Sequence, residues 1–338
     1  MNAHGYASYR KIFIAGMALL VITAIAVCFI GRFSITPSDI IKLFTRQTIA
    51  DGDVKRHILF DIRLPRVILS IMVGAALALA GTAMQGILQN PLASPDVLGT
   101  ASASGFGAAA GILFFGNNLF ATLILSFTAG LLSIFLVVAL CRLKKDFSIL
   151  SIVLSGIIIS SLFVSLLSIL KFAADPNDTL PAITFWLMGS FASSGTAQIV
   201  FILIPFLLGT GLLYLFRWKL NILSLGDDDA KIAGVHPKLV KSIVLGAATV
   251  LIAAAVTVSG MIGWVGLVIP HATRKIIGSN HGYVLPLSSV FGALFMLLSD
   301  TFARTIGFSE IPIGIITSLT GAPLFALLFL FKDAFVHE

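Results

Sequence analysis

The chain has 338 residues, of which 58% are hydrophobic and 11% are charged, and its formal net charge is +7. Soluble domains carry about 25% charged residues, so this composition excludes a water-soluble domain and predicts an all-α protein that crosses a membrane many times. The cationic residues lie in loops between apolar runs, where they encode orientation, which excludes a nucleic-acid-binding surface. Cys28 and Cys141 lie within or at the ends of apolar runs and provide neither a disulfide framework nor a metal-ligand spacing.

The first apolar run covers residues 12–30 and follows Arg10 and Lys11. A signal peptide is the alternative interpretation, because Ala24-Ile25-Ala26 resembles a cleavage site. The run continues past that point, however, and is longer than the roughly 7–15 apolar residues of a signal peptide. We therefore expect a first membrane-spanning helix here.

Long apolar runs continue to the end of the chain. With the first one, hydropathy predicts about eight spans of roughly 20 residues each. They cover residues 12–30, 67–88, 120–140, 149–170, 199–216, 240–258, 284–306 and 311–331. Two weaker stretches, 97–115 and 262–278, are rich in small residues or broken by glycine. Including both brings the expected number of spans to ten, and we expect the first of them to be surrounded by protein rather than lipid.

The connections between the spans are polar. Residues 32–61 predict a loop with one amphipathic turn near 40–44, and residues 183–187 predict a short helix at the surface. If the N-terminus is cytoplasmic, the C-terminus is cytoplasmic too, and most loop cations fall inside, as the positive-inside rule requires. These cations are Arg142, Lys144, Lys145, Arg217, Lys219, Lys238, Lys241, Arg274, Lys275 and Lys332. The exceptions, which fall outside, are Lys55, Arg56, Arg63 and Arg66.

Residues 225–235 form a small charged segment between two long apolar runs. The segment predicts a short pair of cytoplasmic helices on which a second protein pushes. The triplet Asp227-Asp228-Asp229 lacks the alternation of a calcium loop. Acidic residues directly after Gly226 instead suit the first turn of a helix, where the helix dipole favours negative charge. We therefore predict a helix start and no metal site.

Two motifs bear on nucleotides. The sequence contains no Gly-Lys pair and hence no Walker A motif, so any nucleotide chemistry lies on another chain. Gly105-x-Gly107-x-x-Ala110 has the spacing of a dinucleotide fingerprint, but no strand precedes it, and we interpret it as a small-residue packing face.

Ionisable residues in the last third of the chain allow more than one interpretation. His271 follows Pro270 in a glycine-broken stretch, where it is either a proton relay or a histidine bonded to backbone. Asp300 and Arg304 lie four residues apart in one span, so they share a face and can pair. Glu310 precedes Pro312, a natural position for a helix start. Structural pairing and docking of a partner both remain open for these charges.

Four stretches together resemble one family, the FecCD-type permease subunits of ATP-binding-cassette importers for iron–siderophore, haem and cobalamin. The similarity extends from about residue 60 to the end of the chain, and its motifs are specific in combination. The stretches are Arg63-Leu64-Pro65-Arg66 with Gly74 and Gly81-x-x-x-Gln85; Asn90-Pro91-Leu92-Ala93-x-Pro95 with Leu98-Gly99; Leu225-Gly226 with Ala230 and Gly234-Val235; and Gly263-Trp264-Val265-Gly266 continuing through His271, Arg274, Asp300, Arg304, Glu310 and Gly321-Ala322-Pro323.

The resemblance implies a single transmembrane permease domain over 1–338 with ten helices, in the bacterial inner membrane. It implies a homodimer around a central pathway, two ATPase subunits that carry ATP and Mg, and a periplasmic substrate-binding protein. No catalytic residue, cofactor or metal ligand is expected on this chain. Coupling helices at about 224–236 are expected to fit a cleft in the ATPase through Leu225, Gly226, Asp227, Asp228, Ala230, Gly234 and Val235.

By the same resemblance, Arg63, Arg66 and Arg304 match arginines that grip carboxylates on the two lobes of the binding protein. This would explain cations on the outer side, since an exposed guanidinium pairs bidentately with a carboxylate. The alternative is that Arg63 and Arg66 anchor a span at the lipid headgroups.

The family's pathway is lined mainly by the fifth and tenth helices, with the third and eighth contributing, and its cytoplasmic gate lies near 148–151. This implies pathway or gate roles for Ser148, Ile149, Leu150, Ser151, Ser155, Gly156 and Ser160. Ile149 and Leu150 stand where relatives can be polar, which favours a more apolar gate.

The expected function is therefore that of a permease that moves a metal chelate from periplasm to cytoplasm and is not itself an enzyme. A molybdate or tungstate oxyanion is the alternative cargo, because selectivity lies largely in the binding protein. An ion-coupled secondary transporter would need ionisable residues at mid-membrane, and the eight long spans offer almost none. A membrane scaffold without transport would leave the broken stretch 262–278 and the outer arginines unexplained.

Overall fold

The computed structural model describes residues 3–31, 33, 35–36, 38–39, 52–116, 118–307 and 309–330. The amphipathic turn expected near 40–44 and the cation Lys332 lie outside these residues. So do a large part of the loop expected at 32–61 and residue 331 of the last expected span.

Eight helices in the described residues are long and apolar enough to cross a membrane, as predicted. They are α1 (Ala3–Phe29), α4 (Leu64–Ile87), α6 (Leu119–Leu143), α7 (Ile149–Ala173), α9 (Thr196–Leu223), α11 (Pro237–Ser259), α13 (His281–Thr305) and α14 (Ile313–Leu330). The two weaker stretches form the shorter helices α5 (Thr100–Phe115) and α12 (Val265–Ile277). The predicted fold class, an all-helical polytopic membrane protein, is confirmed.

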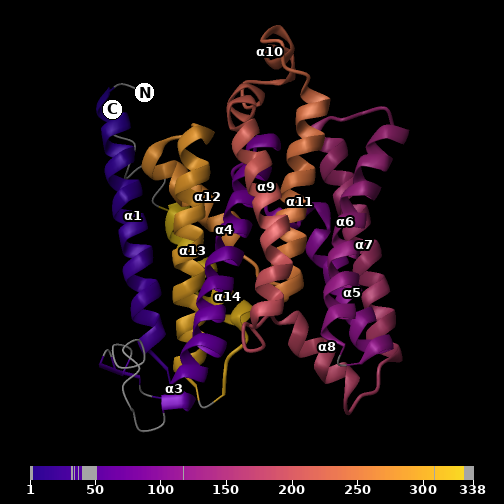
Figure 1. Ribbon diagram of the computed structural model, residues 1–338. Helices are drawn as coiled ribbons and strands as arrows, with labels where there is room; N and C mark the ends of the chain where they lie inside the picture. Colours follow the sequence, from indigo (N-terminus) through magenta and orange to yellow (C-terminus); the bar gives the residue numbers. More distant parts are fainter. Residues whose placement is uncertain are drawn as a thin grey trace.

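The long helices run side by side in one bundle, and short helices mark its two ends (Figure 1). The helix α10 (Asp227–Ile232) stands at the end where α1 begins. At the opposite end lie α3 (Gly52–His57), the π-helical segment η1 (Ile58–Arg63) that leads into α4, and α8 (Thr179–Leu187). The short surface helix expected at 183–187 is therefore confirmed as part of α8.

The helix α4 is buried along almost its whole length, because glycines let its neighbours approach its backbone. A Cβ atom built on Gly74 would lie 2.2 Å from the carbonyl oxygen of Gly292 in α13. A Cβ atom on Gly81 would lie 1.8 Å from the carbonyl oxygen of Gly266 in α12. In the same way, Gly107 of α5 packs against a carbonyl of α6, which confirms the packing interpretation of the 105–110 motif. Small residues thus bind the centre of the bundle together.

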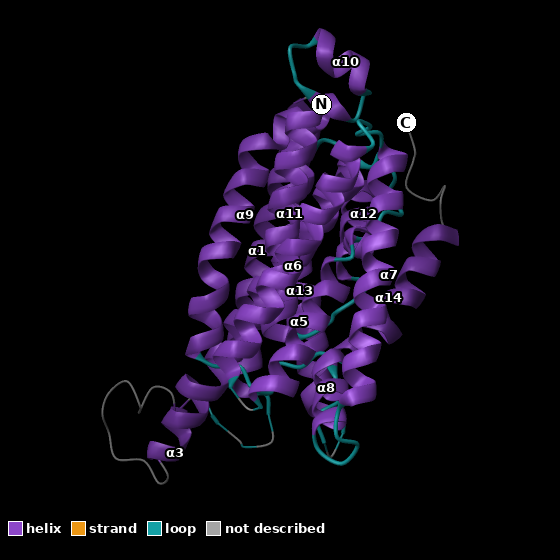
Figure 2. Ribbon diagram, turned by 90° about the vertical axis from the view of Figure 1, so that its right-hand side faces the viewer, coloured by secondary structure: helices purple, strands orange, loops and turns teal. Residues whose placement is uncertain are grey.

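Two connections within the height of the bundle interrupt its α-helical structure. Between α4 and α5 the chain forms the 3₁₀ helix η2 (Pro95–Leu98), and residues 260–264 precede α12. Loop segments are visible among the helices beside α7 and α14 (Figure 2). Such backbone is tolerated at membrane depth only where it is buried in protein or faces water. These two connections therefore mark places where the bundle is not simply surrounded by lipid.

The charged segment 225–235 differs in one respect from its prediction. It forms one six-residue helix, α10, and not a pair of helices. The three aspartates do occupy its first turn, as predicted from the helix dipole. The segment is too short for two helices, because Gly226 has φ +130° and Gly234 has φ +75°, so the chain turns at both ends of α10.

Candidate functional site

The exposed end of the bundle at α10 carries apolar side chains that its own fold does not cover. Leu225 is 71% exposed and Ile232 is 86% exposed, whereas Ala230 between them is buried against the bundle. The turn after α10 closes with a hydrogen bond of 2.8 Å from the Val235 amide to the Ala230 carbonyl. A short, well-formed helix with apolar side chains facing outward is typical of a protein–protein contact.

A part-buried ion pair holds α10 against the bundle. Nζ of Lys241, in the first turns of α11, donates to Oδ2 of Asp227 at 2.7 Å. The Lys241 side chain is almost completely buried, so this pair holds the start of α10 against α11. On the exposed side of α10, Lys231 donates to Asp228 at 2.8 Å, and this hydrogen bond lowers the pKa of Asp228.

The loop between α6 and α7 lies next to α10. Asp146 accepts hydrogen bonds from the amide and hydroxyl of Ser148, each at 2.9 Å, and from the Ser151 hydroxyl. These hydrogen bonds, that of Ser151 foremost, hold the pKa of Asp146 well below its usual range. A cleft of about 460 Å³ separates this loop from α10 and α11, and its lining includes Lys145, Asp146, Asp227, Lys231 and His236. Sequence reasoning missed Asp146; the available signal was its place just before Ser148, a residue type favoured at the N-cap of a helix.

The predicted pathway residues divide between two faces of α7. Ser148 and Leu150 are exposed and Ile149 is half-buried. Ser151, Ser155 and Gly156 instead face the interior of their own subunit. A Cβ atom on Gly156 would lie 2.0 Å from the Val97 carbonyl oxygen, so this glycine is needed for η2 to cross α7. Their role in lining a pathway stays a prediction, made for residues that the structure buries within one subunit.

The outward face of α7 carries a different set of serines. Ser161, Ser165 and Ser168 are exposed among leucine and isoleucine side chains, and Ser160 is half-buried and hydrogen-bonded to Ser102 at 3.2 Å. The exposed serines of α7 thus lie in its second half, whereas Ser151 and Ser155 are covered by their own subunit.

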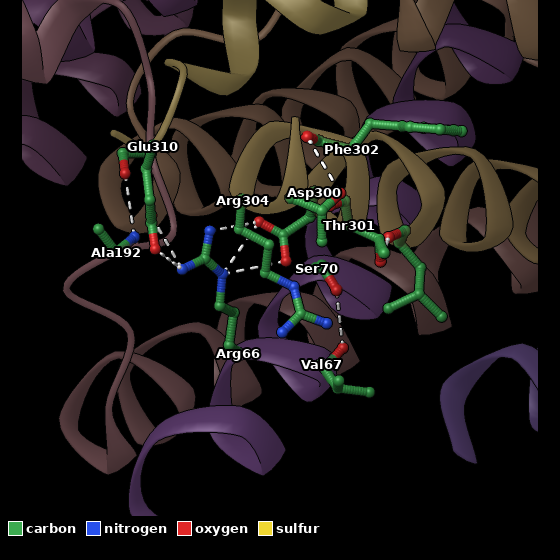
Figure 3. A network of polar contacts seen from close by, with 12 residues as sticks. Arg66, Val67, Ser70, Ala192, Asp300, Thr301, Phe302, Arg304 and Glu310 are labelled. Atoms are coloured by element: carbon green, nitrogen blue, oxygen red, sulfur yellow. Dashed lines mark hydrogen bonds and ion pairs between the residues drawn. The ribbon is translucent and has the colours of Figure 1, made fainter. Parts of the chain in front are cut away.

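At the opposite end of the bundle, Arg66 lies at the centre of a buried ion network (Figure 3). Its guanidinium donates to Asp300 at 2.8 and 3.0 Å and, through Nη1, to Glu310 at 2.9 and 3.0 Å. Arg66 is only 7% exposed and Asp300 1%, whereas the side chain of Glu310 is 37% exposed. One guanidinium therefore joins α4, α13 and the connection that leads into α14.

Arg63 and Arg304 are buried beside this network and donate hydrogen bonds to the C-terminal end of α1. Arg63 donates to the carbonyl oxygens of Cys28 at 2.7 Å and Phe33 at 2.5 Å. Arg304 donates to the carbonyl oxygen of Val27 at 2.8 Å. The last four carbonyls of a helix have no partner within it, so two arginines from other parts of the chain cap the C-terminus of α1.

These contacts correct three expectations. The three arginines are buried, so the expected exposure of their guanidinium groups is wrong, and so is the alternative of lipid headgroup anchoring for Arg63 and Arg66. Asp300 pairs with Arg66 and not with Arg304. The physical reason is that α1, α4 and α13 converge at this end of the bundle, and a guanidinium desolvated there requires carboxylates or carbonyls. Any docking role must therefore act through this internal network.

Two further residues of the sequence motifs, Arg274 and His271, hold α12 against α4 and α14. Arg274 donates to Gln85 and, at 3.0 Å, to the Thr82 carbonyl, both in α4. The His271 ring packs 5.7 Å from the Phe325 ring of α14. Across the described residues, no group of three or more His, Cys, Asp or Glu side chains is arranged to hold a metal ion.

The bundle consists of long and broken apolar helices, with an exposed short helix at one end and ion pairs at both ends. This arrangement defines a polytopic membrane protein of the transporter class. Residues 19–331 match the FecCD transport family, and the chain belongs to it. As a permease of an ATP-binding-cassette importer it is not itself an ATPase, and the family carries no cofactor. Such a permease works with an ATPase and a binding protein.

Relatives and a solved structure agree with this assignment. The chain is 41% identical over 323 residues to "Molybdate import system permease protein MolB" of Haemophilus influenzae, covering 95% of this chain and 96% of that protein. It is 42% identical to "Probable iron chelatin transport system permease protein" of Helicobacter pylori, covering 79% of this chain and 81% of the relative. It superposes with a TM-score of 0.86 on a protein described as a metal-chelate type ABC transporter in an inward-facing conformation, with 40% identity and coverage of 95% and 99%.

Proposed function

We propose that this chain forms, as a homodimer in the bacterial inner membrane, the pathway through which a metal chelate of the iron–siderophore, haem or cobalamin type enters the cytoplasm. The observation that carries the proposal is α10, a short helix with exposed Leu225 and Ile232 that the Lys241–Asp227 ion pair holds against α11. Two ATPase subunits bind the two copies of α10. In this arrangement α10, the start of α1 and the end of α14 are cytoplasmic, and the end of the bundle at Arg66 is periplasmic.

The same geometry suggests how the ATPases act on the pathway. Closure of the ATPases displaces α10. Because α10 and the α6–α7 loop line the two sides of one cleft, this displacement changes the width of the cleft and so affects Asp146 and the start of α7. The outward faces of α7 and α14, with Ser161, Ser165 and Ser318 among apolar side chains, line the pathway between the subunits. A periplasmic binding protein docks at the opposite end, where its carboxylates compete with the part-exposed Glu310 for Arg66.

Molybdate or tungstate is the second candidate cargo. It is favoured by the 41% identity to the permease named for molybdate import. Membership of the FecCD family removes the ion-coupled secondary transporter and the scaffold from consideration, because the relatives are import permeases.

The cargo can be identified from whole-cell contents of iron, cobalt, molybdenum and tungsten in a deletion strain with and without the gene restored. The media supply ferric chelates, haem, cobalamin and the two oxyanions in turn. We expect a loss of iron or cobalt that the gene restores. A loss confined to molybdenum or tungsten would establish the oxyanion alternative, and no change in any element would contradict both.

Replacing Gly234 with valine is expected to uncouple ATP hydrolysis from uptake. Gly234 has φ +75°, and a left-handed conformation costs an ordinary residue about 1–2 kcal/mol, a factor of roughly 5 to 30 in an equilibrium. A Cβ atom there would meet nothing within 4 Å, so the effect arises from the backbone. Uptake per ATP hydrolysed, measured on the assembled transporter, should fall in Gly234→Val. Gly234→Asn is the control, because asparagine tolerates this conformation; equal uptake in wild type and Gly234→Val would remove this turn from the mechanism.

A further inference from the structure

An acidic side chain of the 3₁₀ helix η2 lies deep within the height of the bundle. The neighbours of Asp96 in the chain both contact other helices. Pro95 packs against Gly266 of α12, and the carbonyl of Val97 lies against Gly156 of α7. Gly156 is the eighth residue of α7, about 10 Å along the helix from its cytoplasmic end at 1.5 Å per residue. A helix of this length exceeds the roughly 30 Å hydrocarbon core by only a few ångströms at each end. Asp96 is therefore at hydrocarbon depth.

Asp96 is an exposed residue, and none of the ion pairs in the described part of the chain includes it. Its side chain has one hydroxyl near it, Ser94 Oγ at 3.4 Å. The helices packed against η2 carry charged residues only near their ends. These residues are Arg66, Arg142, Lys171, Lys238, Lys241, Arg274 and Lys275.

An exposed, unpaired carboxylate at this depth is incompatible with a lipid-facing surface. Ionisable residues within a membrane face the interior of a bundle or a water-filled cavity, and they mark the route of the transported species. Non-helical backbone at this depth has the same requirement. Asp96 satisfies both conditions at once, on a segment that crosses α7 just before its exposed serines.

We propose that Asp96 faces the aqueous pathway between two copies of this chain and is a specificity-determining residue for the cargo. The two symmetry-related carboxylates give this level of the pathway a negative potential. They favour a chelate that presents cations or hydrogen-bond donors and disfavour a bare oxyanion. This statement rests on the proposed function and narrows it to the chelate.

The position of Asp96 can be tested without knowing the cargo. In a chain whose Cys28 and Cys141 are replaced by alanine, single cysteines are introduced as Asp96→Cys and Leu215→Cys, and the assembled transporter in membranes is treated with water-soluble, charged methanethiosulfonate reagents. Leu215 is 76% exposed on α9, eight residues from the end of that helix and hence at a similar depth. The helices α9 and α14 lie on opposite sides of the bundle (Figure 2). We expect Asp96→Cys to react at least about tenfold faster than Leu215→Cys; equal, slow reaction at both sites would overturn the proposal.

The negative potential can be measured separately at Ser161. This residue lies on the exposed face of α7, next to Ser160, which contacts Gly99. In Ser161→Cys, a cationic reagent should react faster than an anionic one of similar size. Adding Asp96→Asn should reduce that preference, whereas Asp96→Glu should keep it. An unchanged preference in Asp96→Asn would show that Asp96 does not set the charge of the pathway, even if Asp96→Cys is accessible.

The cargo assignment is tested by the elemental measurement together with Asp96→Asn. An identified chelate whose uptake falls severalfold in Asp96→Asn and is preserved in Asp96→Glu supports the proposal. Gene-dependent uptake of molybdenum or tungsten, or chelate uptake that does not respond to Asp96→Asn, overturns the specificity role. If no element is transported, the proposed function fails, but the reagent experiments still decide whether Asp96 faces water.

Discussion

Replacing Arg66 with alanine is expected to destabilise the protein by about 3–5 kcal/mol, the cost of breaking a buried ion pair from one side. The substitution leaves the carboxylate of Asp300 buried and uncompensated, because its hydrogen bonds of 2.8–3.0 Å all come from Arg66. It also releases Glu310 and with it the start of α14. The measurement is the thermal unfolding midpoint of the detergent-purified permease.

The matched control is Arg56→Ala, which removes an arginine at the same end of the bundle that is exposed to solvent. It should leave the midpoint unchanged within error, since exposed charges contribute about 0–1 kcal/mol. Arg66→Ala combined with Asp300→Asn should recover part of the loss, because no charged carboxylate then remains buried at that position. An Arg66→Ala protein with the wild-type midpoint but weaker binding-protein affinity would show that Arg66 serves docking and not the fold.

Gly81→Ala is expected to destabilise the protein by about 3 kcal/mol, at the upper end of the range for overpacked cores. The new Cβ atom would lie 1.8 Å from the Gly266 carbonyl oxygen, 2.5 Å from its carbonyl carbon and 2.7 Å from its Cα. All three are backbone atoms, so no side chain can rotate away and α12 must move from α4. That movement also strains the contacts of Arg274 with α4, and the fraction of correctly assembled permease after extraction should fall.

Gly246→Ala provides the control for this substitution. Gly246 lies inside α11, and a Cβ atom there would meet nothing within 4 Å. An alanine in an open helical position costs nothing sterically and removes the conformational freedom of glycine, so stability should stay equal or rise by about 0.4–1 kcal/mol. Equal losses in Gly81→Ala and Gly246→Ala would contradict the packing argument.

Hydropathy predicted the spans well, because a lipid-crossing helix must be apolar over most of its length. The two short helices were also predicted, from glycine and other small residues. The glycines mark where these helices begin, because α5 follows Gly99 and α12 follows Gly263–Trp264. The pairing of Arg66 with Asp300 could not be predicted, since the residues are 234 positions apart and Arg304 offered a nearer partner.

The faces of α7 show a second limit. Serines occur all along this helix, and its apolar residues surround it, so no polar stripe indicates which side faces outward. Periodicity places Ser151 and Ser155 on one face, but only the crossing of η2 at Gly156 identifies that face as internal. The capping of α1 by Arg63 and Arg304 was equally hidden, although α1 carries no basic residue in its own last turn and therefore needed donors from elsewhere.

The ion pair of Lys241 with Asp227 has a mechanical consequence. It joins the outermost helix, α10, to α11, which is buried among α4, α5, α6 and α9. A force on α10 therefore passes first to α11, whose apolar stretch is 72% buried, and from there to the helices packed around it. Helices at the outside of the bundle, among them α7 and α14, have apolar stretches that are only 33% and 22% buried, so fewer contacts within the subunit oppose their displacement. The Lys241–Asp227 pair is thus a direct link between the exposed α10 and the interior of the subunit.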